Sequence, residues 1–176
     1  KVPVNSMKYG LAFSDSIMFD LGFKNGDKVL AVDGKTIDDY TDIVKKLILG
    51  SQVSIERDGK IESIALPVDL IGKLVEKKRN RTPLLEPRIP VIAKIVPDTS
   101  NAFKAGLKAG DKVLAVNSTP AAFFDQFSLL LRNNKGQNIN LSVLRGADTV
   151  SFQAPVSEKG QLGFVPIAAI TDLDSA

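Results

Sequence analysis

An eleven-residue segment occurs almost twice in this 176-residue chain, and the second copy lies 84 positions after the first. Residues 22–32 read GFKNGDKVLAV and residues 106–116 read GLKAGDKVLAV, so nine of the eleven positions match. A period of this length is too long for a solenoid repeat and suits a small independent domain. The repeat therefore predicts two copies of one small domain, and function has to be considered copy by copy.

Two residue types are absent, and their absence narrows the possible chemistry. The sequence contains no histidine and no cysteine. Serine–histidine–aspartate triads, H-E-x-x-H zinc helices and cysteine nucleophiles or thiolate metal sites are therefore excluded from this chain. We expect no catalytic residues, no metal ligands and no cofactor within it.

Charge and hydropathy exclude further classes. The formal net charge is +3, and basic residues are spread through both copies, so no nucleic-acid partner is predicted. Hydrophobic residues make up 44% of the sequence, yet no apolar run approaches the ~20 residues that cross a bilayer. The composition is that of a soluble globular protein. Because the chain starts inside a predicted strand without a signal peptide, we expect it to be part of a longer protein.

The first copy has a recognisable order of elements. The patterns predict a strand over residues 7–13, a short helix over 15–21 and a buried strand over 28–32. Apolar residues with helical spacing predict a longer amphipathic helix over residues 39–48. Alternating apolar residues on both sides of Asp58-Gly59 predict a hairpin.

The second copy repeats this order. Strands are predicted over residues 91–96 and 112–116, with a short helix over 100–105 between them. A long helix over residues 123–131 and a hairpin turning at Arg145-Gly146 follow. The predicted fold class is α+β, with each copy a small, partly open β-barrel or sandwich that carries two helices.

The repeated segment resembles the G-L-x-x-G-D-x-[ILV]-[ILV]-x-[IV]-[DN]-G signature of bacterial PDZ domains. The matching residues are Gly22, Gly26, Asp27, Asp33 and Gly34 in the first copy and Gly106, Leu107, Gly110, Asp111 and Asn117 in the second. The second copy departs from the signature at Ser118, where glycine is usual. The resemblance implies a first PDZ domain over residues 1–86, a second over 87–169 and a tail over 170–176, both domains circularly permuted relative to the animal arrangement.

PDZ domains bind extended peptides between a sheet edge and the long helix, and a G-x-Φ-G-Φ loop (Φ, an apolar residue) receives the terminal carboxylate. The sequence GQLGF at residues 160–164 matches that loop. We therefore expect backbone donors and a pocket floor at Leu162, Gly163, Phe164 and Val165, and a helix wall at Phe124, Phe127 and Leu131. The alternatives are that the loop only closes the sheet in a tight turn and that Phe127 and Leu131 serve the core.

The first copy has a poorer counterpart. Residues 83–87 read PLLEP, which lacks both glycines and includes two prolines without an N–H donor. The equivalent peptide-contacting residues would be Leu84, Leu85 and Glu86 on the strand and Tyr40, Ile43 and Leu47 on the helix. The alternative is a strand with no binding role.

The tandem arrangement resembles the PDZ pair of site-2-type intramembrane zinc metalloproteases, the RseP family. The resemblance extends over residues 70–78, 93–97 and 162–167. It implies a periplasmic loop of an inner-membrane protease whose Zn²⁺ and H-E-x-x-H motif lie elsewhere in the protein. In that family the pair roofs the active site and admits membrane-protein substrates that have been trimmed beforehand, such as anti-sigma factors, by size exclusion or by binding their new C-termini.

Two alternatives remain from the sequence. A PDZ pair could also belong to an HtrA-like serine protease or to a scaffold that presents peptide C-termini. Within the connector, about residues 70–82, basic side chains accompany apolar ones at helical spacing. Such a segment can bind an anionic membrane surface. It can equally be a solvated helix that packs between domains.

Overall fold

The chain divides into two compact units. The computed structural model describes residues 7–76 and 83–167. The units are Lys1–Arg88 and Ile89–Ala176. The sequence-based boundary between residues 86 and 87 falls two residues earlier, inside a strand that belongs to the first unit. Each unit contains one copy of the eleven-residue segment, and each is described below by itself.

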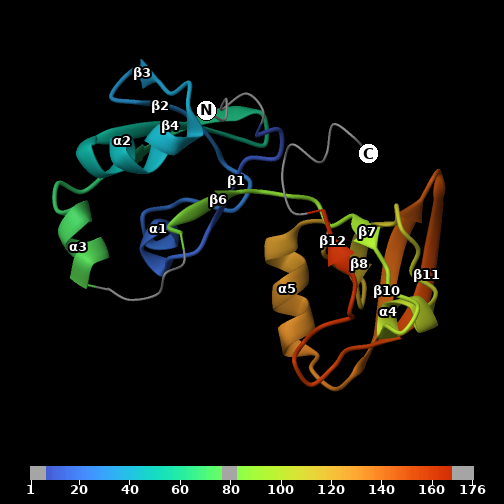
Figure 1. Cartoon of the computed structure of the whole chain (residues 1–176). Coiled ribbons are helices and arrows are strands. Elements are labelled where there is room, and N and C mark those ends of the chain that lie inside the picture. The colour runs from blue at the N-terminus through green and yellow to red at the C-terminus, as the bar shows by residue number, and fades with distance from the viewer. Residues whose placement is uncertain (1–6, 77–82, 168–176) are drawn as a thin grey trace. The chain divides into compact units, whose positions relative to one another are not determined.

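The first unit combines two open sheets with short helices (Figure 1). Its larger sheet has the strand order β3-β2-β4-β5, and its smaller sheet pairs β1 with β6, all antiparallel. In chain order the elements are β1 (Leu11–Phe13), α1 (Ser16–Asp20), β2 (Lys28–Val32), β3 (Lys35–Thr36), the 3-10 helix η2 (Tyr40–Asp42), α2 (Ile43–Leu49), β4 (Gln52–Arg57), β5 (Lys60–Ala65), α3 (Leu70–Glu76) and β6 (Leu85–Pro87).

Local sequence signals explain most of these elements. Asp15 caps α1, because its side chain accepts from the N–H of Ile17 at 2.9 Å. The predicted long helix begins as η2 and continues as α2, which buries Ile43 and Leu47 in the core of the unit. The first predicted strand is shorter than expected, since only residues 11–13 pair with another strand.

The second unit repeats the arrangement with longer hairpin strands. Its sheets have the orders β11-β10-β8-β9 and β12-β7. The elements are β7 (Ala93–Ile95), α4 (Asn101–Ala105), β8 (Lys112–Val116), β9 (Thr119–Pro120), α5 (Phe124–Asn133), β10 (Asn138–Arg145), β11 (Asp148–Pro155) and β12 (Val165–Pro166). The closing strand β12 comes last in the chain and pairs with β7, the first strand of the unit. The predicted α+β class with open sheets is confirmed.

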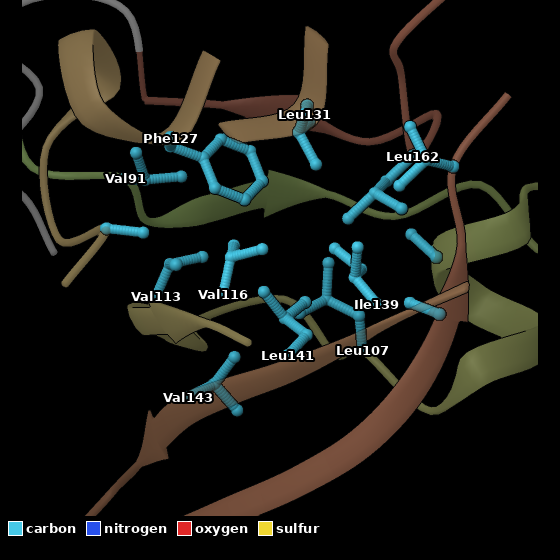
Figure 2. Packing of buried hydrophobic residues seen from close by; sticks show 14 of the residues in the cluster. Val91, Leu107, Val113, Val116, Phe127, Leu131, Ile139, Leu141, Val143 and Leu162 are labelled. Carbon is cyan, nitrogen blue, oxygen red and sulfur yellow. The ribbon is translucent and has the colours of Figure 1, made fainter. Parts of the chain in front are cut away.

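The core of the second unit lies between α5 and the larger sheet (Figure 2). Phe127 and Leu131 of α5 are 3% and 5% exposed, and they face strand residues such as Val116 and Leu141. Leu162, from the segment before β12, is 2% exposed and belongs to the same cluster. Burial of its side chain anchors that segment to the core, at roughly 1.5–3 kcal/mol for a leucine of this kind.

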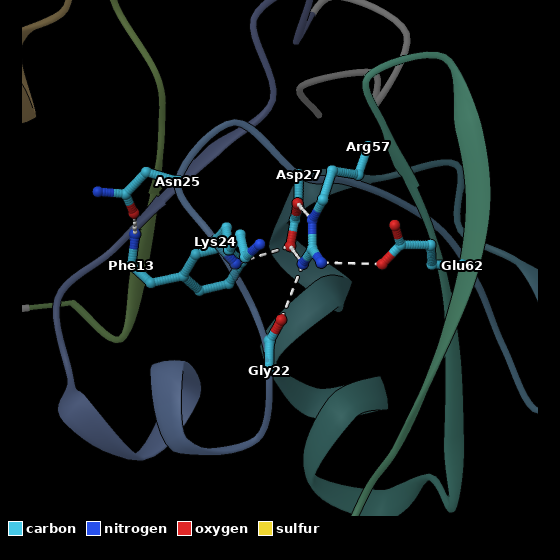
Figure 3. A network of polar contacts seen from close by, with 7 residues as sticks. All are labelled: Phe13, Gly22, Lys24, Asn25, Asp27, Arg57 and Glu62. Atoms are coloured by element: carbon cyan, nitrogen blue, oxygen red, sulfur yellow. Dashed lines mark hydrogen bonds and ion pairs between the residues drawn. The ribbon is translucent and has the colours of Figure 1, made fainter.

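Each unit also contains an ion pair between a partly exposed arginine and a buried aspartate, which the sequence patterns did not reveal. In the first unit Arg57 donates from Nε and Nη2 to the two carboxylate oxygens of Asp27, at 2.8 and 2.7 Å, and also reaches the carbonyl of Gly22 (Figure 3). Arg145 binds Asp111 and the carbonyl of Gly106 in the same way. The Gly-x-x-x-Gly-Asp spacing therefore builds a carboxylate that ties the repeat to the hairpin.

The environment of the second pair favours the charged carboxylate. Asp111 is 1% exposed, and burial by itself would raise the pKa of its carboxyl group. Hydrogen bonds from Arg145 and from the N–H of Lys108 outweigh burial, so the pKa of Asp111 lies below its ordinary value of 3.8. A buried carboxylate with these donors remains ionised at neutral pH.

Candidate functional site

The second unit contains an elongated pocket between α5 and the segment that precedes and includes β12. Its cavity volume is about 540 Å³, within the range of small-ligand and peptide sites. The lining residues come from these two elements only: Phe124, Phe127, Ser128, Leu131, Arg132, Lys159, Gly160, Gln161, Leu162, Gly163, Phe164 and Pro166.

The structure brings most of the predicted second-copy residues together at this pocket. Phe124, Phe127 and Leu131 line it from the helix, and Leu162, Gly163 and Phe164 line it from the opposite side. Phe127 and Leu131 are buried and also belong to the core, so one helix face contributes to both. Val165 does not line the pocket; it pairs with Ile95 on β7 and is 48% exposed.

Several lining residues were missed by the sequence reasoning. Ser128 and Arg132 lie four and eight positions after Phe124, on the same face of α5. That helical spacing is a signal in the sequence, but Ser128 and Arg132 are polar, and the helix face was predicted from apolar residues only. Gln161 occupies the variable position of the G-x-Φ-G-Φ motif, and Lys159 directly precedes the loop, where no pattern in the sequence distinguishes it from other surface residues.

The loop of residues 160–164 is held in place from both sides. The carbonyl of Leu162 accepts from the N–H of Ala102 near the start of α4, at 2.9 Å. The carbonyl of Gln161 accepts from the N–H of Ser157, also at 2.9 Å. Gly163 has φ +84°, a region that favours glycine, and it lies directly against Ser100, the N-cap residue of α4.

The carbonyl groups of Gln161 and Leu162 bond to other parts of the unit, whereas the following backbone N–H groups of the loop do not. Within residues 7–76 and 83–167, the backbone N–H groups of Leu162, Gly163 and Phe164 have no hydrogen-bond acceptor. Consecutive free N–H groups around a glycine with positive φ form an anion-binding concavity. Carboxylate binding by this loop, which the sequence motif predicts, stays a prediction.

The strand that continues from the loop presents one free edge. Val165 pairs with Ile95, and the N–H of Ile167 bonds to the carbonyl of Ile92 at 2.9 Å, so these residues direct their polar groups toward β7. In an antiparallel strand alternate residues face opposite edges, which places the polar groups of Phe164 and Pro166 on the edge toward the pocket. Phe164 offers a carbonyl there, whereas Pro166 has no N–H to offer.

The charge of the pocket lining is positive. Arg132 and Lys159 lie on the rim, and no aspartate or glutamate is among the lining residues that the structure describes. The remaining lining is dominated by aromatic and aliphatic side chains. A ligand that combines an apolar group with a carboxylate would therefore match the lining on both counts.

The first unit differs at the corresponding place. The phenolic hydroxyl of Tyr40 donates to the carbonyl of Leu85 on β6 at 2.9 Å. Burial, and secondarily the charge of Glu86, raises the pKa of the Tyr40 phenol. Ile43 and Leu47, predicted as groove-wall residues, are 1% and 0% exposed and lie in the core.

The strand residues of this predicted site are also occupied. Leu85 is 1% exposed, and the carbonyl of Leu84 accepts from the N–H of Ser14 at 3.1 Å. Glu86 is exposed and pairs with Ala12 in the β1–β6 ladder. A peptide-binding role for the first-copy residues therefore stays a prediction.

The connector is described only in part. Helix α3 covers Leu70–Glu76, with Leu70 fully buried, Ile71 54% exposed and Lys73 paired with Asp69 at 3.3 Å. Most of its basic residues, Lys77, Lys78, Arg79 and Arg81, lie outside the described residues. The structure thus places the start of this helix on the first unit, and its membrane-binding role stays a prediction.

Residues 7–76 and 83–167 contain no group of three or more acidic, histidine or cysteine side chains arranged to hold a metal ion. None of the helices in these ranges is both long and apolar enough to span a bilayer.

The sequence is similar to a known domain family and to several proteases. Residues 70–156 match the PDZ domain family. The chain is 28% identical over 165 residues to a protein of Neisseria meningitidis serogroup A that is named as a zinc metalloprotease, covering 80% of this chain and 37% of the relative. It is 34% identical over 93 residues to the regulator of sigma-E protease RseP of Escherichia coli, covering 51% and 20%.

A different protease class also matches. The chain is 27% identical over 152 residues to a DegP-like periplasmic serine endoprotease of Chlamydia trachomatis, covering 74% of this chain and 30% of the relative. The chain therefore spans between one fifth and about two fifths of the length of these relatives.

Proposed function

The chain is a PDZ region of the RseP family of zinc metalloproteases, and from this premise we propose that its second unit binds the C-terminus of an extended peptide. The terminal carboxylate is received by the backbone N–H groups of Leu162, Gly163 and Phe164. The last side chain of the peptide enters the apolar pocket beside Phe127 and Leu131. The observation that carries the proposal is the set of three consecutive free N–H groups at the end of an apolar pocket.

The strand edge limits how much of the peptide is bound. The carbonyl of Phe164 accepts one backbone N–H of the added strand, but Pro166 cannot donate in return. The ladder therefore supports only the last few residues of a ligand. Recognition of this kind reads a chain end, with its carboxylate and final side chain, and gives weak affinity in the micromolar to millimolar range.

In the whole protease, the proposed role is regulatory. The region roofs an intramembrane zinc active site from the periplasmic side and admits substrates whose extracytoplasmic part has been removed. Anti-sigma factors are the proposed substrate class, since their trimming creates a new C-terminus. Size exclusion by the paired units and capture of that C-terminus act together in this proposal. The proposal is supported by the relationship to RseP and by the histidine-free, cysteine-free sequence.

The direct test is a titration of the 176-residue chain with two versions of one peptide. One version ends in a free carboxylate on an apolar residue, and the other carries a C-terminal amide. Binding is followed by chemical-shift changes of backbone amides. We expect the acid to shift the amides of residues 162–164 and the amide form to bind at least tenfold more weakly, because charge-assisted hydrogen bonds contribute about 1.5–3 kcal/mol each. Equal binding of both forms, or binding of neither, would refute carboxylate capture.

A second test addresses the gating role in a full-length protease that carries this region. Variants of the loop should slow cleavage of a substrate with a trimmed extracytoplasmic part while leaving untrimmed substrate excluded. If the loop variants cleave trimmed substrate at the normal rate, the C-terminus is not read and size exclusion alone accounts for gating.

The similarity to DegP-like serine endoproteases supports one alternative. In that case the same groove presents peptide C-termini to a serine protease domain or scaffolds them. The two roles share the chemistry of the groove and differ in the attached catalytic domain. Zinc-chelator sensitivity of the intact protease distinguishes them, because a serine protease would retain its activity.

A further inference from the structure

The two units can be aligned by their backbone hydrogen bonds, independently of side-chain identity. In each unit a residue just after the closing strand donates its N–H to the residue that directly precedes the first strand of the smaller sheet. These bonds run from Arg88 to the carbonyl of Gly10 and from Ile167 to the carbonyl of Ile92, both at 2.9 Å. Three positions before the donors stand Leu85 and Phe164. These two residues therefore occupy equivalent places, each with a carbonyl on the edge toward the long helix.

The N-terminal end of the long helix, called its head below, differs between the units at one equivalent position. With the repeat offset of 84 residues, Tyr40 of the first unit is equivalent to Phe124 of the second. In the first unit the Tyr40 hydroxyl donates to the carbonyl of Leu85 at 2.9 Å. In the second unit Phe124 has no hydroxyl, and no donor among the described residues reaches the carbonyl of Phe164. Phe124 is 52% exposed, whereas Tyr40 is half-buried.

From this difference we propose that the residue at the head of the long helix selects which PDZ unit accepts a peptide. Tyr40 closes the first groove, because its hydroxyl occupies the carbonyl that an added strand must use. Phe124 leaves the second groove open. The inference rests on the proposed function in one respect, namely that the peptide binds by strand addition.

The physical basis is competition for one acceptor. An incoming peptide N–H would have to displace the Tyr40 hydroxyl from the Leu85 carbonyl and leave that half-buried hydroxyl without an acceptor. Replacing one neutral hydrogen bond by another gains nothing, and the unsatisfied hydroxyl is unfavourable. The raised pKa of the Tyr40 phenol agrees with a hydroxyl held away from water. The first-copy strand also lacks the glycine loop, so no carboxylate contact compensates for the loss.

Two reciprocal variants test the proposal in the full 176-residue chain. Phe124→Tyr introduces the hydroxyl into the second unit, and Tyr40→Phe removes it from the first. Phe103→Tyr is the matched control for the former, because Phe103 is 51% exposed on α4 and does not line the pocket. Each chain is labelled with ¹⁵N and titrated with the peptide acid and its amide, so that the amides of each unit report separately.

The expected results are specific to each unit. Phe124→Tyr should weaken binding of the acid to the second unit about fivefold, the effect of one neutral hydrogen bond, while Phe103→Tyr leaves it unchanged. Tyr40→Phe should allow peptide-induced shifts in β6 that the unsubstituted chain lacks. The acid and the amide should bind this opened unit alike, because it has no carboxylate loop.

Outcomes that contradict the proposal are separable from failure of the proposed function. If the unsubstituted second unit binds no peptide, carboxylate capture is wrong, and Tyr40→Phe alone then decides whether the tyrosine closes the first groove. If the second unit binds normally but Phe124→Tyr has no more effect than Phe103→Tyr, the selector role is wrong. Peptide-induced shifts in β6 of the unsubstituted chain, or none in Tyr40→Phe, would likewise overturn it.

Discussion

Replacing Gly163 by alanine is expected to separate the binding loop from ordinary backbone strain. Gly163 has φ +84°, and a Cβ atom there would lie 3.2 Å from the Cβ of Ser100, closer than most such contacts. A left-handed alanine is unfavourable by about 1–2 kcal/mol, partly offset by roughly 0.4–1 kcal/mol from reduced freedom of the unfolded chain. The net loss from φ is about 1 kcal/mol, and the contact with Ser100 pushes the loop away from α4.

The displacement should affect binding more than stability. The carboxylate depends on three adjacent N–H groups, and each charge-assisted hydrogen bond contributes about 1.5–3 kcal/mol. Misalignment of one donor corresponds to an affinity loss of about 10- to 100-fold. Calorimetric titration with the peptide acid measures this loss, and urea-induced unfolding measures the change in the free energy of unfolding.

Gly146 provides the matched control in the same unit. It has φ +60°, it lies in the β10–β11 turn, and an added Cβ meets no atom within 4 Å. Gly146→Ala should therefore lower the free energy of unfolding by a similar ~1 kcal/mol without changing the affinity for peptide. If Gly163→Ala binds peptide as tightly as Gly146→Ala, the loop does not receive the carboxylate.

Further predictions concern the repeated framework. Arg57→Met should lower the unfolding free energy of the first unit by about 3–5 kcal/mol because it leaves buried Asp27 unpaired. The control Lys28→Met removes an exposed ion pair in the same unit and should lower it by less than about 1 kcal/mol. Equal losses for the two variants in urea unfolding followed by NMR would contradict this interpretation. The pKa of Asp111 is lower in the folded than in the unfolded state, so its contribution to the free energy of unfolding is full above the ordinary value of 3.8 and is lost as the pH falls through the lower folded value. Asp111→Asn should therefore reduce the dependence of the unfolding free energy on pH in this acidic range. Ser118 has φ +66°, so Ser118→Gly should raise the melting temperature, corresponding to roughly 0.5–1 kcal/mol, and an unchanged or lower value would show that the turn is not strained.

Much of the second site was predictable because its signals are local. The motif at residues 160–164 and the apolar spacing of Phe124, Phe127 and Leu131 belong to residues that line the two sides of one pocket. Arg132 shares the helical spacing of Phe124 but is polar, so the apolar pattern did not include it, and no pattern around Lys159 indicates its place beside the pocket. Val165 was predicted because it directly follows the motif, but it pairs with Ile95 of β7 and does not line the pocket.

The sequence predicted the aspartates of the two ion pairs but not their arginine partners. The sequence identified Asp27 and Asp111 as repeated residues in a turn. Their arginine partners lie 30 and 34 positions later, in strands that the hairpin brings back against the turn. Since the antiparallel pairing of β2 with β4 and of β8 with β10 sets these contacts, no short-range pattern could reveal them.

By itself, the sequence indicates that one domain pattern occurs twice, that each copy is α+β with helices and hairpins in a given order, and that histidine and cysteine are absent. These conclusions depend on periodicity, turn residues and composition, which act over a few neighbouring positions. Only the tertiary structure shows which side chains reach the closing strand of each unit. Tyr40 and Leu85 are 45 residues apart, and their contact exists because the closing strand returns to the head of the long helix. In the first unit the Tyr40 hydroxyl makes this contact, whereas Phe124 at the equivalent position of the second unit has no hydroxyl.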